Sequence, residues 1–308
     1  MGLGRSLTAL ACLLALLGGA VSSPANASGS VGPEPVDPVI SVLPPVPVPY
    51  QPYAGRTCRS GSPQCIVRVV RTMRQRLRPL ARSCDHDAIF SLAYLRVTQN
   101  VKAAADAGYF SDRTWLTRLD AVFAKKYFRT LNTWNAGRRS AVPKAWQVAL
   151  RASDDRSLTG LGDFLINMNA HINNDFPHAL AAVGLTDRRG RSHKPDHNAY
   201  NQRLDSLYVP VFKEEARRFD PAFDDLDAGP FDETGAGLVM RGWREMVWRH
   251  AENLVTAKTP QQRQLAEQMI EQYAASQAQM IKALFTSPDR SAARDAYCTA
   301  RRRVANQR

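Results

Sequence analysis

Five short polar side chains that can carry chemistry recur at helical spacing in one segment of the chain. Asp163, Asn167, His171 and Asp175 follow one another at intervals of four residues, and His178 comes three residues later. Side chains three or four residues apart lie on the same face of an α-helix. We therefore expect these five to share one face, where an imidazole and a carboxylate, such as His171 and Asp175, can ligate one divalent cation.

Two other segments contain residues that could complete such a site. A helix is expected to open at Pro195, with His197 and Asn201 four residues apart in its first turns, and His86 and Asp87 stand at the start of an earlier helix. The candidate ligands of a divalent metal such as zinc are His171, Asp175 and His197. A metal there would lower the pKa of a bound water and polarise an ester or phosphoryl oxygen, which is the chemistry of a hydrolase. The wider candidate pocket consists of Asp163, Asn167, Asn169, His178, His86, Asp87 and Asn201.

The segment with the spaced polar residues is expected to be buried. It contains no Lys, Arg or Glu from Ser157 to Ala182, although 22% of the chain is charged. Short polar groups in a buried helix must be satisfied by other side chains, by water or by a metal. Two interpretations stay open: a metal-binding or catalytic pocket, and a structural network in which His171 and Asp175 bond to each other.

The rest of the chain predicts an all-α fold. Apolar residues recur with helical periodicity from Cys58 onward, and prolines and glycines separate the periodic stretches. We expect one bundle-like or orthogonal domain of about eight or nine helices over residues 58–308, with N-caps at Asp112, Thr259 and Asp289. The predicted helices span residues 63–82, 86–107, 112–135, 142–153, 157–182, 196–218, 236–257, 260–285 and 289–304.

Residues 1–57 are expected to stand outside this domain. Arg5, the apolar stretch from Leu7 to Val21 and the small residues ending at Ala27 are typical of a secretory signal peptide over residues 1–27, cleaved after Ala27. A proline-rich linker follows at 28–57, for which we expect an extended or disordered spacer. No later stretch has the length and apolarity of a transmembrane helix. The chain is therefore expected to be secreted, in the extracellular space or the cell envelope.

Cleavage would remove Cys12 and leave four cysteines. An even number of cysteines in an exported chain favours disulfides, and no C-x-x-C spacing points to a metal site. Four cysteines allow three connectivities. We favour Cys58–Cys65, a local link, together with Cys84–Cys298, which ties the first long helix to the last.

The formal net charge of +13 is carried mainly by arginines, with clusters at residues 71–82 and 301–303. Such a field attracts anionic partners, for example nucleic acid, acidic wall polymers or lipid headgroups, so the expected partner is an anionic envelope component or a small ligand. A solvated, arginine-rich helix face is the alternative. No aromatic residues interleave with the arginines and no nucleic-acid-binding motif is present, which argues against a nucleic acid as partner.

One stretch resembles the signature of a known family. The run Met168-Asn169-Ala170-His171-Ile172-Asn173-x-Asp175 resembles that of an uncharacterised, all-helical bacterial family of unknown function, and the resemblance covers about residues 86–257. It implies a helical fold and carries no activity. The signal peptide, the linker and the cysteines then mark a secreted branch, with all four cysteines outside the recognised core. The other matching positions are Phe90, Tyr94, Trp115, Phe123, Tyr127, Trp146 and Asp196-His197-Asn198.

Three functions remain open from the sequence. The first is an exported metal-dependent hydrolase built on His171, Asp175 and His197. The second is a non-catalytic protein that binds a small ligand or an envelope component against the polar residues. The third is a structural envelope protein in which those residues form only a buried network. Convergence of the three candidate ligands around an open cavity would favour the first.

Overall fold

The computed structural model describes residues 43–223 and 233–306, and within this part of the chain the fold is all-α, as predicted. The predicted signal peptide, residues 1–27, lies outside the described residues, as does the linker up to residue 42. Besides the helices, the described residues contain only two isolated β-bridges. The α-helices are α3 (Gln64–Ser83), α4 (Asp87–Asp106), α5 (Arg113–Asn135), α6 (Lys144–Asp154), α7 (Gly160–Asn169), α8 (Phe176–Val183), α9 (Lys194–Asp205), α10 (Tyr208–Arg218), α11 (Glu233–Thr256), α12 (Pro260–Phe285) and α13 (Pro288–Asn306).

Each predicted helix has its counterpart, and two of the predicted segments are subdivided. The segment 157–182 becomes α7, a π-helical segment η2 (Ala170–Asp175) and α8, while 196–218 becomes α9 and α10. A short 3₁₀ turn, η1 (Arg139–Ala141), precedes α6. Because the backbone stays right-handed through Asn169 and Phe176, α7, η2 and α8 form one continuous helical rod.

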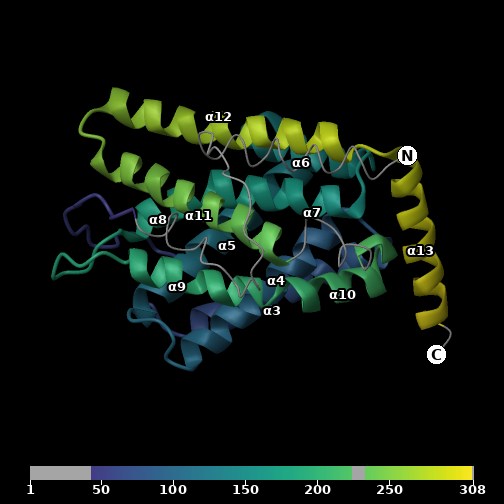
Figure 1. The fold of residues 1–308 in the computed structure, drawn as a ribbon, viewed down its shortest axis with the longest axis horizontal. Coiled ribbons are helices and arrows are strands. Elements are labelled where there is room, and N and C mark those ends of the chain that lie inside the picture. Colours follow the sequence, from purple (N-terminus) through teal and green to yellow (C-terminus); the bar gives the residue numbers. More distant parts are fainter. Residues whose placement is uncertain (1–42, 224–232, 307–308) are drawn as a thin grey trace, which may run out of the picture.

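This rod runs through the middle of the molecule (Figure 1). The helices α6 and α12 pack against it and against each other, and α11 lies along α8. On the other side, α4 contacts α7, and α5 contacts α8 and η2. The helix α13 runs across one end of the bundle. The prediction that 157–182 forms a central, buried segment is therefore confirmed.

Local sequence explains where these helices begin. The Asp112 side chain accepts a hydrogen bond from the Trp115 backbone amide at the start of α5. Thr259 forms a reciprocal capping box with Gln262 at the start of α12, with Pro260 in the first helical position. The third expected cap is wrong, because α13 begins one residue earlier and Asp289 lies inside its first turn.

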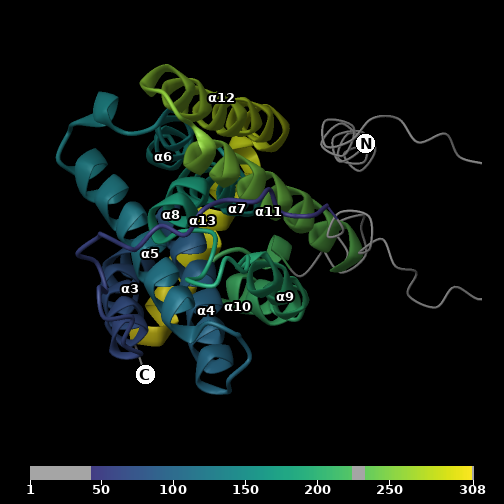
Figure 2. The same cartoon turned by 90° about the vertical axis from the view of Figure 1, so that its left-hand side faces the viewer.

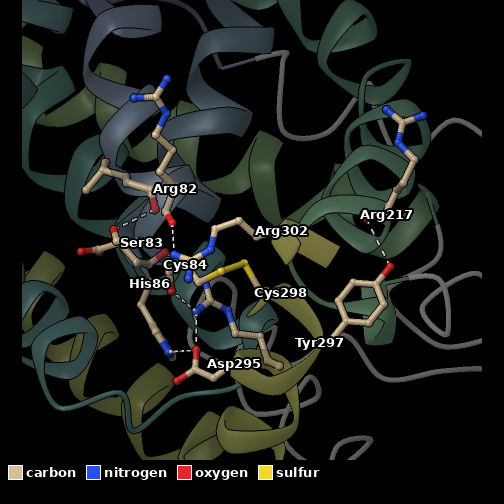
Figure 3. Close-up of a disulfide and its surroundings, with 12 residues drawn as sticks. Arg82, Ser83, Cys84, His86, Arg217, Asp295, Tyr297, Cys298 and Arg302 are labelled. Atoms are coloured by element: carbon tan, nitrogen blue, oxygen red, sulfur yellow. Dashed lines mark hydrogen bonds and ion pairs between the residues drawn. A yellow bond between two sulfur atoms is a disulfide. The ribbon is translucent and has the colours of Figure 1, made fainter. Parts of the chain in front are cut away.

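Both predicted disulfides are present. Cys58 is joined to Cys65, and Cys84 is joined to Cys298. The second bond fixes α13 to the end of α3, as the close-up in Figure 3 shows. Buried Arg294 strengthens this junction by donating from Nη1 to the Cys84 carbonyl at 2.7 Å. The C-terminal helix is thus anchored covalently and through a buried guanidinium.

The described part of the predicted linker, residues 43–57, is extended and lies against the helical domain (Figure 2). Arg249 of α11 donates to the carbonyls of residues 43 and 44, at 2.8 and 2.9 Å. Glu252 accepts from the backbone amide of residue 46 at 2.8 Å, and Thr186 donates to the carbonyl of residue 48. These contacts tie the extended segment to α11 and to the loop after α8.

Candidate functional site

An apolar cavity of about 150 Å³ is lined by α4, α5, the central rod, α9, α10 and α11. Aromatic and aliphatic side chains from all of these elements form most of its wall, because the inward faces of the helices are rich in Phe, Tyr, Leu and Val. The aromatic residues of the wall are Phe90, Tyr94, Phe110, Trp115, Phe123, Phe164, Phe176, Tyr200, Tyr208 and Phe212.

His171, from the π-helical segment, reaches this wall and is bonded to Asp175. Its Nδ1 lies 3.0 Å from Asp175 Oδ2, and its ring stacks on Phe123 with 3.7 Å between the centroids. The carboxylate also accepts from Trp146 Nε1 at 2.9 Å. A proton on Nδ1 leaves Nε2 as an acceptor, and this buried atom has no hydrogen-bond partner among the described residues. Burial lowers the pKa of His171, so the ring is neutral at neutral pH.

His197 also lies in the cavity wall, but it forms a hydrogen bond to the main chain of another helix. Its Nε2 donates to the carbonyl of Arg244 at 3.0 Å, and this bond joins α9 to α11. Burial lowers the pKa of His197 well below its ordinary value. The Phe176 ring stacks on Phe123 at 4.4 Å between centroids and lies 5.6 Å from the His197 ring, so aromatic rings connect the two histidines.

The predicted three-ligand metal site is not formed. The structure brings His171 and Asp175 together, but His197 is held by a backbone carbonyl instead of joining them. Across residues 43–223 and 233–306, no group of three or more His, Cys, Asp or Glu side chains is placed to hold a metal ion. The physical reason is that the rings of Phe123 and Phe176 lie between the two histidines, and that His197 Nε2 is committed to the Arg244 carbonyl.

The predicted common face of the spaced polar residues is also divided. A π-helical turn closes with i→i+5 hydrogen bonds, so side chains before and after it do not keep the α-helical register. Asn167 Nδ2 donates to the Asp163 carbonyl, and Asn169 Nδ2 donates to the Ala274 carbonyl of α12, both at 2.9 Å. His178 is half-buried, and burial lowers its pKa to about 4. Asn167, Asn169 and His178 lie outside the cavity wall.

Asp163 belongs to a separate buried cluster at the junction with α13. His86 Nδ1 lies 2.5 Å from Asp163 Oδ2, and His86 Nε2 lies 3.3 Å from Asp295 Oδ1 (Figure 3 shows His86 and Asp295). Burial raises the pKa of Asp163 to about 6. Burial, with a smaller effect from Asp85, raises the pKa of neighbouring Asp87 to about 7. His86, Asp87 and Asp163 lie outside the cavity wall, so they are not part of its chemistry.

Several polar residues of the cavity wall were missed by the sequence analysis. Tyr94 Oη, Thr98 Oγ1, Asp120 Oδ2 and Tyr208 Oη are buried and have no hydrogen-bond partner among the described residues. Burial raises the pKa of Asp120 to about 7. Arg244 is also in the wall, and candidate Asn201 accepts from its Nε at 2.6 Å. The signals available in the sequence were an acid, Asp120, between Leu119 and the apolar stretch 121–124, and an arginine, Arg244, directly after Trp243.

The comparisons with known proteins assign a family. Residues 66–284 match the model of a family described as "Family of unknown function (DUF5995)". The chain belongs to this family. The DUF5995 match is longer than the 86–257 expected, contains every residue of the cavity wall, and includes Cys84, so not all four cysteines lie outside it. No curated protein and no solved structure matches the chain. Within the part of this DUF5995 chain that the structure describes, the helices are too short or too polar to cross a membrane.

Proposed function

We propose that this protein binds a small, mainly apolar molecule in the cavity between α4, α5, α9, α10, α11 and the central rod. The observation that carries the proposal is the combination of an apolar, aromatic wall with polar atoms that have no protein partner. Ligand sites are typically concave and apolar, with a few polar groups that orient the ligand. An apolar protein cavity of about this volume is known to accept benzene, so a molecule with one ring is of suitable size.

The unpartnered polar atoms are the reason to favour binding over a purely structural role. A buried donor or acceptor without a partner costs about 1–3 kcal/mol. Tyr94, Thr98 and Tyr208 each carry such an atom in the cavity wall. Asn167 and Asn169, which lie outside the cavity wall, instead donate to main-chain carbonyls. A ligand with a polar substituent would supply the missing hydrogen bonds inside the cavity.

We further propose that binding takes place outside the cytoplasm. The two disulfides are typical of an oxidising compartment. Export by the signal peptide at residues 1–27 agrees with this setting. The basic residues Arg71, Arg74 and Arg78 of α3 line a surface groove with Lys102 of α4, and such a surface favours an anionic envelope component as neighbour.

A second candidate function is hydrolysis without a metal. The specific observation in its favour is that Asp175 orients His171, whose Nε2 is free to accept a proton at the cavity. A positioned general base contributes about 10²–10⁴ to a rate. The test is cleavage of phenyl acetate by the wild-type protein and by His171→Gln and Asp175→Asn. Loss of turnover in both variants supports catalysis, whereas equal rates in all three proteins leave binding alone.

The proposed binding is tested by calorimetric titration of the disulfide-bonded protein with benzyl alcohol. Ala93 of α4 lies in the cavity wall, so Ala93→Phe fills the space and should abolish binding. Ala103→Phe, on the exposed face of the same helix, is the matched control and should bind as the wild type does. Melting curves verify that both variants are folded. Binding that survives in folded Ala93→Phe would place the ligand elsewhere and refute the proposal.

A further inference from the structure

Arg244 of α11 is a buried cation without a carboxylate partner among the described residues. Its side chain donates from Nε to Asn201 Oδ1 at 2.6 Å and from Nη2 to the His197 carbonyl, and both acceptors are neutral. Its Nη1 has no hydrogen-bond partner within residues 43–223 and 233–306. The residue is 7% exposed and belongs to the cavity wall.

Three other cations on α9 and α11 are paired with carboxylates. Lys194 lies 2.7 Å from Glu245, Arg249 contacts Glu245 and Glu252, and Arg241 contacts Asp205. Removing a charge from water without compensation is costly, and pairing is the usual remedy in proteins. Arg244 therefore differs from Lys194, Arg241 and Arg249 in lacking an anion among the described residues.

The surroundings of Arg244 favour an anion that comes from the cavity. Tyr200 and Tyr208 line the same cavity as Arg244, and Tyr208 Oη has no hydrogen-bond partner among the described residues. Burial lowers the pKa of Arg244 to about 10, which leaves the guanidinium charged at neutral pH. An uncommitted N–H and an uncommitted phenol in the wall of one small cavity form a suitable pair of donors for a single oxyanion.

We propose that the ligand of this cavity is a small monocarboxylic acid with a ring-sized apolar body, whose carboxylate pairs with Arg244 and accepts from Tyr208. The inference rests on the proposed binding function and specifies the chemical class of the ligand. One guanidinium compensates one negative charge, which favours a carboxylate over a phosphate dianion. Asp196, the other acid of the wall besides Asp120, does not compete, because both of its oxygens accept from the backbone amides of Ser111 and Asp112.

Asp120 defines the main competing ligand class. Asp120 Oδ2 has no hydrogen-bond partner among the described residues, and Asp120 lies in the same wall. In its ionised form it would attract an amine ligand and repel a carboxylate. Burial raises the pKa of Asp120 to about 7, so much of it is neutral at neutral pH. Asp120 and Arg244 both act on the pKa of Tyr200, so the two ligand classes must be separated by experiment.

Four probes of nearly equal size separate these possibilities: benzoate, benzyl alcohol, benzylamine and toluene. Each is titrated at neutral pH into the full disulfide-bonded protein and into three variants. Arg244→Met removes the charge, and Tyr208→Phe removes one hydroxyl with little risk to folding. Arg249→Met is the matched control, because Arg249 is on the same helix but outside the cavity wall. We expect benzoate to bind about tenfold or more tighter than benzyl alcohol, since a charge-assisted hydrogen bond is stronger than a neutral one.

The variants should then remove this preference selectively. Arg244→Met should weaken benzoate by about tenfold or more, Tyr208→Phe should weaken it less, and both should leave toluene unchanged. Arg249→Met should bind all four probes as the wild type does. If benzyl alcohol and toluene bind but benzoate binds no tighter, the carboxylate inference is wrong and the binding function stands. If benzylamine binds most tightly, Asp120 is the anchor and the inference is overturned. If none of the probes binds, the binding function fails and the inference fails with it.

Discussion

Asp120→Asn offers a quantitative test of the environment of the cavity wall. Asp120 is 9% exposed, lies among apolar side chains, and its Oδ2 has no hydrogen-bond partner among the described residues. Burial therefore penalises the ionised form, and its pKa rises to about 7. The native state then holds the proton more tightly than the unfolded chain, so the stability of the protein must fall as the pH rises between about 4 and 7. Asparagine has nearly the same shape and no charge.

The magnitude follows from linkage. An aspartate with a pKa of about 3.9 in the unfolded chain and about 7 in the native state costs about 4 kcal/mol once both are ionised. Asp120→Asn should therefore be more stable than the wild type by up to about 4 kcal/mol at pH 8. At pH 4.5 the gain in stability should fall to about 1 kcal/mol. The native carboxyl is then protonated, and only its ionisation in the unfolded chain still favours unfolding of the wild type.

The assay is urea unfolding of both proteins at pH 8 and pH 4.5 with the disulfides intact. Asp106→Asn is the control, because Asp106 is exposed and hydrogen-bonded to Lys102, which lowers its pKa. That variant should show a small effect of the opposite sign, being slightly less stable than the wild type at pH 8. A gain for Asp120→Asn that is equal at both pH values, or a loss at pH 8, would refute the reasoning.

Three further predictions concern the frame around the cavity. Replacement of Cys84 and Cys298 by serine should lower the free energy of unfolding by about 5 kcal/mol in the chain-entropy model, since the bond closes a loop with a sequence separation of 214. Chemical denaturation measures this loss, and an unchanged midpoint would contradict the prediction. His86→Ala should cost about 3–5 kcal/mol by leaving the buried Asp163 carboxylate unpaired, and a thermal melt equal to that of the wild type would argue against a paired cluster. Thr259→Ala should cost about 1 kcal/mol through loss of the capping box, and hydrogen exchange should speed up in the first turn of α12 while the rest of that helix is unchanged.

Much of the fold could be predicted because it depends on local pattern. Helical periodicity, prolines and glycines located the helices, and the absence of long charged side chains identified 157–182 as the central segment. The Cys84–Cys298 pairing was favoured among three possible connectivities, because it ties the first long helix to the last. These features are written in short stretches of sequence and need no knowledge of tertiary packing.

The candidate site was harder to predict because it depends on which helices meet. The four-residue spacing of Asp163 and Asp175 suggested a shared face, but the π-helical turn between them changes the register. Asp163 consequently pairs with His86 outside the cavity, while Asp175 holds His171 at its wall. Arg244 lies far from His171 in the sequence, on a different helix. It reaches the same cavity only because α11 packs against the central rod.

The most direct test of the central claim is NMR of the methionine methyl groups during titration with benzyl alcohol. Met168 and Met240 lie in the cavity wall, whereas Met269 is 44% exposed on α12. A ligand in the cavity should shift the Met168 and Met240 methyl signals in a saturable manner and leave Met269 unchanged. Unmoved Met168 and Met240 signals at saturating benzyl alcohol would contradict the assignment of this cavity as a binding site.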